Sequence, residues 1–191
     1  MLWHKEVNIP DKTDLVILPG GFSYGDYLRC GAIAAKSPIM SAINDFYLKG
    51  GFILGICNGF QVLTETNILP GALITNQNQK FICKKEEIIV QNSNTDFTRL
   101  YKNYQTLNYP IAHHDGQYFI DQNGLSKLIE EDRIAFKYKN NPNGSIDNIA
   151  GIFSENKRVL GLMPHPERAI HKDIGGTSGK KLFRSILQSI S

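Results

Sequence analysis

Cysteine is scarce in this sequence, and the scarcity limits the classes of protein to which the chain can belong. Its 191 residues include three cysteines, Cys30, Cys57 and Cys83, which make an odd and sparse set. Such a set does not build the disulfide framework of a small secreted domain and fits a reducing compartment. We therefore expect a cytoplasmic protein.

Long hydrophobic runs and clusters of one charge are also missing. The longest apolar stretches, such as residues 52–57, are too short to span a bilayer, and residues 1–6 lack the basic and apolar regions of a signal peptide. The net charge is only +3, and the basic residues never form a run. These absences predict a soluble protein with neither a membrane nor a nucleic acid as partner.

What is present is an ordinary globular composition arranged in strand and helix patterns. Residues 14–19 and 52–57 are short apolar runs, typical of strands buried on both faces of a parallel sheet. A helix is expected between them, capped by Ser37, and another is expected to begin at residue 58. No linker or internal repeat interrupts the pattern, so residues 1–191 are predicted to form a single domain.

The order of elements changes in the second half of the chain. Extended segments are expected at 72–92 and 109–120, strands at 134–139, 148–153 and 158–163, and helices at 125–131 and 178–190. The last two strands should pair around residues 154–157. The predicted fold class is α/β, with a doubly wound, mostly parallel sheet and added antiparallel strands.

Cys57 stands where a buried strand passes into a helix, with Gly55 and Gly59 two residues away on each side. This is the cysteine counterpart of the nucleophile elbow, a tight turn that exposes its side chain at the carboxyl edge of the sheet. The helix N-terminus stabilises a thiolate there. The alternative is a buried core cysteine, since cysteine packs as a small hydrophobe. Cys30 and Cys83 lack such a setting, and we expect both to be inert packing residues.

A nucleophilic cysteine needs an oriented base, and His165 is the candidate. Pro164 and Pro166 hold it in an extended segment, where residues two apart face the same side, so Glu167 should project beside it. One imidazole nitrogen could then face the carboxylate and the other Cys57, as in a catalytic triad. The alternative is a rigid surface turn with an incidental ion pair.

The glycine-rich loop at residues 19–26 follows the neighbouring strand at the same edge of the sheet. We predict that the backbone N–H groups of Gly21 and Asn58 form an oxyanion hole. The alternative is a turn that uses glycine only for its geometry.

Two other patterns resemble functional motifs and are rejected. Residues 175–181 are one residue short of the P-loop spacing and follow no predicted strand. The run at residues 113–115, His-His-Asp, has no further cysteine or histidine at ligand spacing, so no metal site is predicted.

The motifs together resemble a known family. Residues 55–61 (Gly-Ile-Cys-Asn-Gly-Phe-Gln) and 164–168 (Pro-His-Pro-Glu-Arg) look like those of the class I (triad) glutamine amidotransferases. Within that class, residues 19–29 are similar to the glutaminase subunits of phosphoribosylformylglycinamidine synthase, a complex of purine biosynthesis. Further matches at 69–73, 81–83 and 111–116 extend the resemblance over nearly the whole chain.

The resemblance implies a flavodoxin-like architecture and a triad of Cys57, His165 and Glu167. In such enzymes the cysteine attacks the side-chain amide of glutamine, ammonia leaves, and water hydrolyses the thioester to glutamate. Gln61 would lie near the bound glutamine. The resemblance also implies two partners, a large synthetase subunit that uses ATP and magnesium on formylglycinamide ribonucleotide, and a small bridging subunit. No cofactor is expected in this chain.

The chain departs from the family at its start. Members of the family open with a strand and a helix before the segment that matches residues 2–6, so we expect a chain truncated at its N-terminus, with an unpaired strand edge. Two alternatives to the leading function stay open. One is another thiol hydrolase or amidotransferase of the same fold, and the other is an inactive interaction module.

Overall fold

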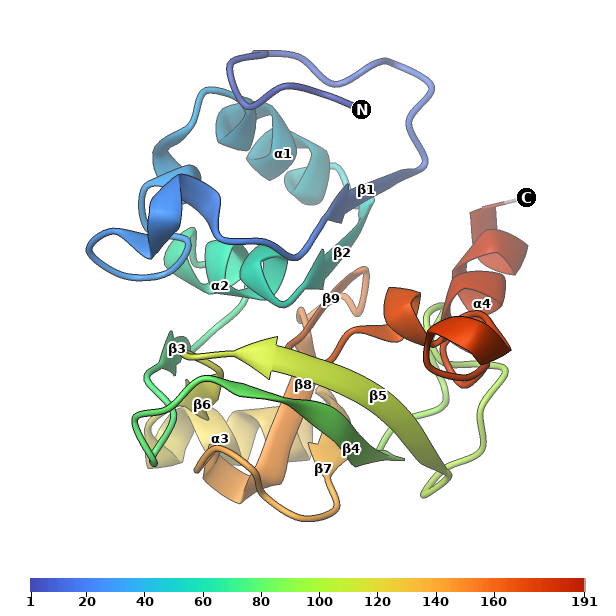
Figure 1. Ribbon diagram of the computed structural model, residues 1–191. Helices are drawn as coiled ribbons and strands as arrows, with labels where there is room; N and C mark the ends of the chain where they lie inside the picture. Colours follow the sequence, from blue (N-terminus) through green and yellow to red (C-terminus); the bar gives the residue numbers. More distant parts are fainter. Residues whose placement is uncertain (191) are drawn as a thin grey trace.

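A seven-stranded sheet in the order β1-β2-β9-β8-β7-β4-β5 runs through the computed structural model, which describes residues 1–190 (Figure 1). A second, two-stranded sheet pairs β3 with β6. The strands are β1 (Leu15–Leu18), β2 (Phe52–Ile56), β3 (Ala72–Ile74), β4 (Ile82–Val90), β5 (Thr106–His113), β6 (Gln117–Phe119), β7 (Ile134–Tyr138), β8 (Ile149–Phe153) and β9 (Val159–Leu162). The α-helices are α1 (Ile39–Leu48), α2 (Asn58–Glu65), α3 (Gln122–Glu130) and α4 (Lys180–Ile190).

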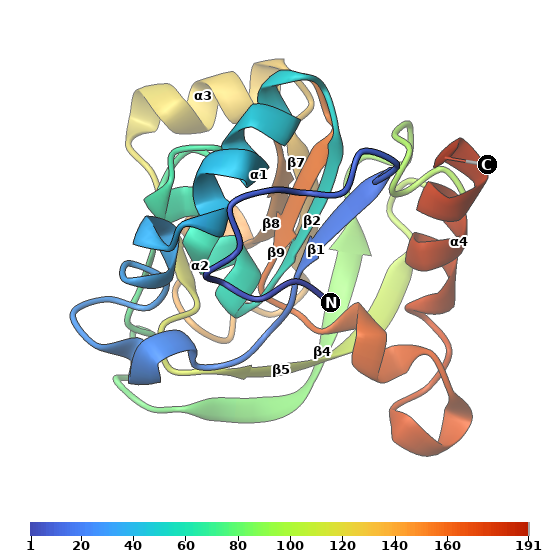
Figure 2. The same cartoon turned by 90° about the horizontal axis from the view of Figure 1, so that it is seen from above.

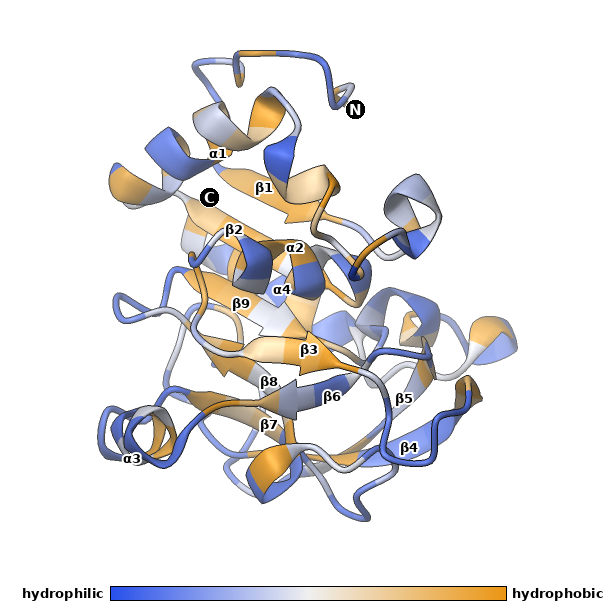
Figure 3. Cartoon of the chain, turned by 90° about the vertical axis from the view of Figure 1, so that its left-hand side faces the viewer, coloured by the Kyte–Doolittle hydropathy of each residue, from blue (hydrophilic) through white to orange (hydrophobic). Residues whose placement is uncertain are grey.

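The parallel part of the large sheet consists of β1, β2 and β9. Figure 2 shows α1 and α2 on one side of these strands and α4 on the other. Every residue of β2 and β9 is buried, which explains their unbroken apolar sequences. Figure 3 shows both strands mostly in hydrophobic colours, whereas β4 carries a hydrophilic stretch.

The strand β1 differs from its prediction. Residues 14–19 were expected to form a strand buried on both faces, but no residue of β1 is fully buried and Ile17 is 45% exposed. The reason lies in its position, because β1 pairs only with β2 and ends the sheet in the described chain. An apolar hollow of about 880 Å³ borders β1 and reaches Gly20 and Asn58.

The rest of the sheet is antiparallel, with β9 pairing with β8, β8 with β7, β7 with β4, and β4 with β5. The predicted hairpin around residues 154–157 is the β8–β9 pair. The fold class predicted from the sequence is confirmed, although the antiparallel pairings outnumber the two parallel ones.

Helix boundaries follow the prediction more closely than helix caps do. Ser37 was expected to cap α1, but its hydroxyl donates to the carbonyl of Ala34 at 2.6 Å, and Pro38 already has helical angles. Residues 175–181 lead from a 3₁₀ turn, Lys172–Ile174, into α4 and follow no strand, as predicted. Within residues 1–190, none of the helices is long and apolar enough to cross a membrane.

Candidate active site

Cys57 occupies a strained turn between β2 and α2. Its backbone angles are φ 51° and ψ −107°, which a residue with a side chain rarely adopts and which cost on the order of 1–3 kcal/mol. The two flanking glycines are required by crowding. A Cβ on Gly59 would lie 2.0 Å from the carbonyl oxygen of Leu18, and one on Gly55 would lie 2.9 Å from the carbonyl of Gly59. The predicted elbow is therefore present in the backbone.

The Cys57 thiol is held in its neutral form. The side chain is 5% exposed, and burial raises the pKa of the thiol to about 12. The backbone N–H of Asn58 opposes this rise in the pKa, while the carboxylate of Glu167 adds to it. The thiol donates to the carbonyl of Ala112 at 3.7 Å. A thiol in this state needs a base before it can act as a nucleophile.

His165 provides a base with a fixed orientation. Its Nδ1 and Oε1 of Glu167 are 2.6 Å apart, and the histidine is 7% exposed. Its Nε2 is buried and forms no hydrogen bond with the described residues. Since Glu167 accepts from Nδ1–H, the other nitrogen is left free to accept a proton.

The predicted contact between His165 and Glu167 is present, but the predicted reason for it is only half right. His165 itself is extended, with φ −102° and ψ 91°, whereas Pro166–Ala169 form a 3₁₀ turn. The carboxylate reaches the imidazole because the turn folds back, and not because an extended chain places the two side chains on one side.

Gly20 joins the two halves of the site, and the sequence interpretation did not single it out. A Cβ on Gly20 would lie 2.8 Å from Cε1 of His165 and 3.6 Å from Cβ of Cys57. The imidazole and the nucleophile are therefore neighbours across a gap that only glycine leaves open. The one sequence signal for this role of Gly20 was its position directly before Gly21, the glycine predicted to take part in the oxyanion hole.

The two residues predicted to form an oxyanion hole differ in what the structure shows of them. The backbone N–H of Asn58 acts to lower the pKa of the Cys57 thiol. Gly21 is exposed, and its φ of 152° is one that glycine adopts readily. The role of both N–H groups as oxyanion donors stays a prediction.

Gln61, predicted to contact substrate, is engaged within the protein. Its Oε1 accepts from Nδ2 of Asn58 at 2.9 Å, and its Nε2 donates to the carbonyl of Asp115 at 2.7 Å. The Asp115 carboxylate in turn accepts from Cys30 at 3.0 Å. Gln61 thus ties the elbow helix to the loop after β5, and contact with substrate stays a prediction.

The other two cysteines differ in burial. Cys30 is 4% exposed and fits the expected packing role, but Cys83 is exposed on β4 and is not a packing residue as predicted. Its strand alternates between buried and exposed faces, and Cys83 falls on the exposed one. No group of three potential metal ligands occurs within residues 1–190.

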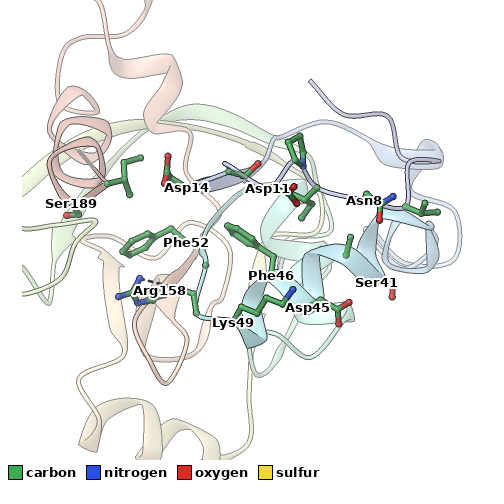
Figure 4. A pocket seen from close by; sticks show the side chains of 18 residues that line it. Asn8, Asp11, Asp14, Ser41, Asp45, Phe46, Lys49, Phe52, Arg158 and Ser189 are labelled. Atoms are coloured by element: carbon green, nitrogen blue, oxygen red, sulfur yellow. Dashed lines mark hydrogen bonds between the residues drawn. The ribbon is translucent and has the colours of Figure 1, made fainter.

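A large hollow lies at the opposite end of the parallel strands. Figure 4 shows its charged and aromatic lining, which includes Asp14, Phe52 and Arg158. These residues stand before or at the first residues of β1, β2 and β9, and the volume is about 760 Å³. The Cys57–His165–Glu167 cluster lies at the carboxyl ends of the same strands, where α/β proteins place their chemistry. The hollow in Figure 4 is therefore separate from the candidate site.

The sequence of this chain is similar to those of known proteins. A family model described as a CobB/CobQ-like glutamine amidotransferase domain matches residues 2–176. A protein of Jannaschia sp. (strain CCS1), named phosphoribosylformylglycinamidine synthase subunit PurQ, is 56% identical over 190 residues, which are 100% of this chain and 86% of the relative. A protein of Helicobacter hepaticus with the same name is 51% identical, over 98% of this chain and 84% of the relative.

Solved structures show the same similarity. A chain in the structure of PurLQS from Thermotoga maritima is 46% identical and superposes with a TM-score of 0.87, over 95% of this chain and 82% of that one. The glutaminase domain of Trypanosoma brucei CTPS has a TM-score of 0.62 at 12% identity, over 98% of this chain and 80% of that one. The second likeness concerns the fold alone.

Proposed function

Because this chain belongs to the family of phosphoribosylformylglycinamidine synthase glutaminase subunits, we propose that Cys57, His165 and Glu167 hydrolyse glutamine and release ammonia for purine biosynthesis. The observation that carries the proposal is the His165–Glu167 hydrogen bond of 2.6 Å beside a buried cysteine in a strained turn. An oriented base next to such a cysteine is the arrangement that activates a thiol.

The first half of the reaction forms a thioester. His165 takes the proton of the Cys57 thiol through Nε2, and the sulfur attacks the amide carbon of glutamine. The N–H of Asn58, with that of Gly21, stabilises the oxyanion. The imidazolium, held by Glu167, then gives its proton to the departing nitrogen, which leaves as ammonia.

The second half regenerates the enzyme. His165 takes a proton from a water molecule, whose oxygen attacks the thioester carbon. The carbon–sulfur bond breaks, glutamate leaves, and the sulfur recovers its proton. Gln61 holds the elbow helix and the loop after β5 in register around the substrate.

The ammonia serves a partner. In the proposal, a large synthetase subunit uses ATP and magnesium to activate formylglycinamide ribonucleotide, and a small third subunit bridges the two in the cytoplasm. The support is the similarity to the chain in the PurLQS structure and the names of the relatives. ATP and magnesium then belong to the synthetase subunit and not to this chain.

The test uses single and double substitutions in the complex. We expect His165→Ala to reduce glutaminase activity by at least about a thousandfold, and His165→Ala with Glu167→Ala to be hardly worse, since the two act as one unit. His171→Ala, which changes an exposed histidine paired with Asp173, is the control and should retain activity. Losses that multiply in the double variant would show that the residues act independently.

A further inference from the structure

The glycine-rich segment at residues 175–179 resembles a phosphate loop in sequence, and the proposed function leaves it without a role. It lies between the turn that carries Glu167 and helix α4, and Figure 1 shows the chain passing from β9 through this region into α4. Gly179 is buried, although residues 170–174 and Thr177 in the same connection are exposed. A buried glycine at the end of an exposed connection calls for an explanation.

Gly179 packs against the backbone of the turn Pro166–Ala169. Its N–H donates to the carbonyl of Ala169 at 2.8 Å. A Cβ on Gly179 would lie 2.0 Å from the carbonyl oxygen of Pro166, which belongs to the peptide group that joins Pro166 to Glu167. Gly179 does not have a left-handed φ, so the close approach of the two backbones alone requires glycine here.

Gly175 lies against another carbonyl of the same turn. A Cβ on Gly175 would lie 2.2 Å from the carbonyl oxygen of Arg168, and its φ of 135° also favours glycine. The two glycines together cover the carbonyls of Pro166, Arg168 and Ala169. One segment therefore fixes the path of the backbone from which the Glu167 side chain projects.

The glycine segment is itself anchored to the core. The carbonyl of Ser178 accepts from the hydroxyl of Tyr101 at 2.9 Å, and Tyr101 is 5% exposed. The carbonyl of Gly179 accepts from the N–H of Leu182 at 3.1 Å, and Leu182 on α4 is fully buried. The turn cannot shift toward the segment without moving α4 or breaking these contacts, because a packed interior transmits strain.

The base of the candidate site is held from two directions. The N–H of His165 donates to the carbonyl of Pro110 on β5 at 2.8 Å, which fixes its main chain. Its imidazole is held through Nδ1, which lies 2.6 Å from Oε1 of Glu167. The direction of the imidazole therefore depends on where the turn places the Glu167 carboxylate, and the glycine segment sets that place.

We propose that Gly179 is a positioning residue, which holds the Glu167 carboxylate against the His165 imidazole. Gly175 supports the same turn. The inference rests on the proposed function. The segment acts only through the Pro166–Ala169 turn, so its contribution should appear in the proton transfers of His165, and hence in kcat, and not in the binding of glutamine.

The test compares Gly179→Ala with the wild type in steady-state hydrolysis of glutamine by the assembled complex. The added methyl group meets a backbone carbonyl, which cannot rotate away as a side chain does, so the turn and Glu167 must shift. We expect kcat to fall by about a hundredfold and the KM for glutamine to change by less than about twofold. In a Glu167→Ala background the same substitution should lower kcat by less than about twofold, because the displaced group is gone.

Two further variants separate this role from a general loss of structure. Tyr101→Phe removes a hydroxyl that bonds to Ser178 and Tyr109, and it should lower kcat by about fivefold, the factor of one hydrogen bond, only when Glu167 is present. Gly176→Ala is the matched control. It adds a methyl group to the same segment at a φ of 113°, but no atom lies within 4 Å of the new Cβ, so it should keep the kcat of the wild type.

The outcomes distinguish the two proposals. A wild-type complex that releases no glutamate from glutamine would refute the proposed function itself. With an active wild type, the positioning role alone is overturned by an unchanged kcat in Gly179→Ala, by an equal loss of kcat with and without Glu167, or by an equal loss in Gly176→Ala. If Gly179→Ala does not melt cooperatively, Tyr101→Phe decides through the same comparison with and without Glu167.

Discussion

At the scale of single residues, the candidate site depends on the lack of a side chain at Gly20 as much as on the side chains of Cys57, His165 and Glu167. Gly20 has no side chain, and the imidazole of His165 fills that space beside Cys57. The sequence interpretation found the nucleophile, the base and the carboxylate, because each belongs to a motif with its own spacing. It missed Gly20, because nothing local distinguishes a glycine that makes room for a distant side chain from one that makes a turn.

Gly20→Ala should therefore disable the enzyme without unfolding it. The new Cβ would lie 2.8 Å from Cε1 of His165, and that ring is held by Glu167, so it must shift by several tenths of an ångström. Displacement of a catalytic group on this scale can lower kcat by about a hundredfold. Steady-state kinetics and thermal melting of the same samples check this. Normal kcat in a variant that melts normally would mean that the ring is free to move.

At the scale of secondary-structure elements, the strands that carry the site were predictable and their side-chain environments were not. The sequence predicted an extended segment at residues 72–92, which the structure divides into β3 and β4. It did not predict the exposure of Cys83, because the face of β4 that packs depends on β5 and β7. His113 was considered only as a metal ligand. Its buried setting comes from Asn76 and Gly116, which no spacing rule connects to it.

The setting of His113 on β5 predicts how stability depends on pH. Its pKa falls from 6.5 to about 4 in the folded chain, so the unfolded chain binds the proton more tightly. The resulting stabilisation is present above pH 6.5 and is lost as the pH falls toward 4, up to roughly 3 kcal/mol. Urea unfolding at pH 7 and pH 4.5 should show a smaller loss in His113→Asn than in the wild type. Equal losses of unfolding free energy in the wild type and in His113→Asn would show that this pH dependence does not come from His113.

At the scale of the whole molecule, the α/β class, the order of elements and an unpaired strand edge were predictable, whereas the strand that forms this edge was not. Apolar runs such as residues 14–19 and 52–57 look alike in sequence, yet β2 lies between two strands and β1 pairs with only one. The number of neighbours of a strand is a property of the complete sheet, and no local pattern encodes it.

Within residues 1–190, β1 has one side that pairs with no strand, and this has a consequence for how this chain behaves in concentrated solution. A strand with unpaired N–H and C=O groups and an exposed isoleucine is a template on which a strand of another molecule can pair, which begins aggregation. The apparent molecular mass measured by light scattering should therefore rise with concentration. Ile17→Lys should reduce this rise, because charge on an edge strand opposes such pairing. Ile129→Lys, at another exposed isoleucine on α3, is the control and should leave the scattering as it is. Equal scattering from wild type and Ile17→Lys would mean that this edge does not serve as a template.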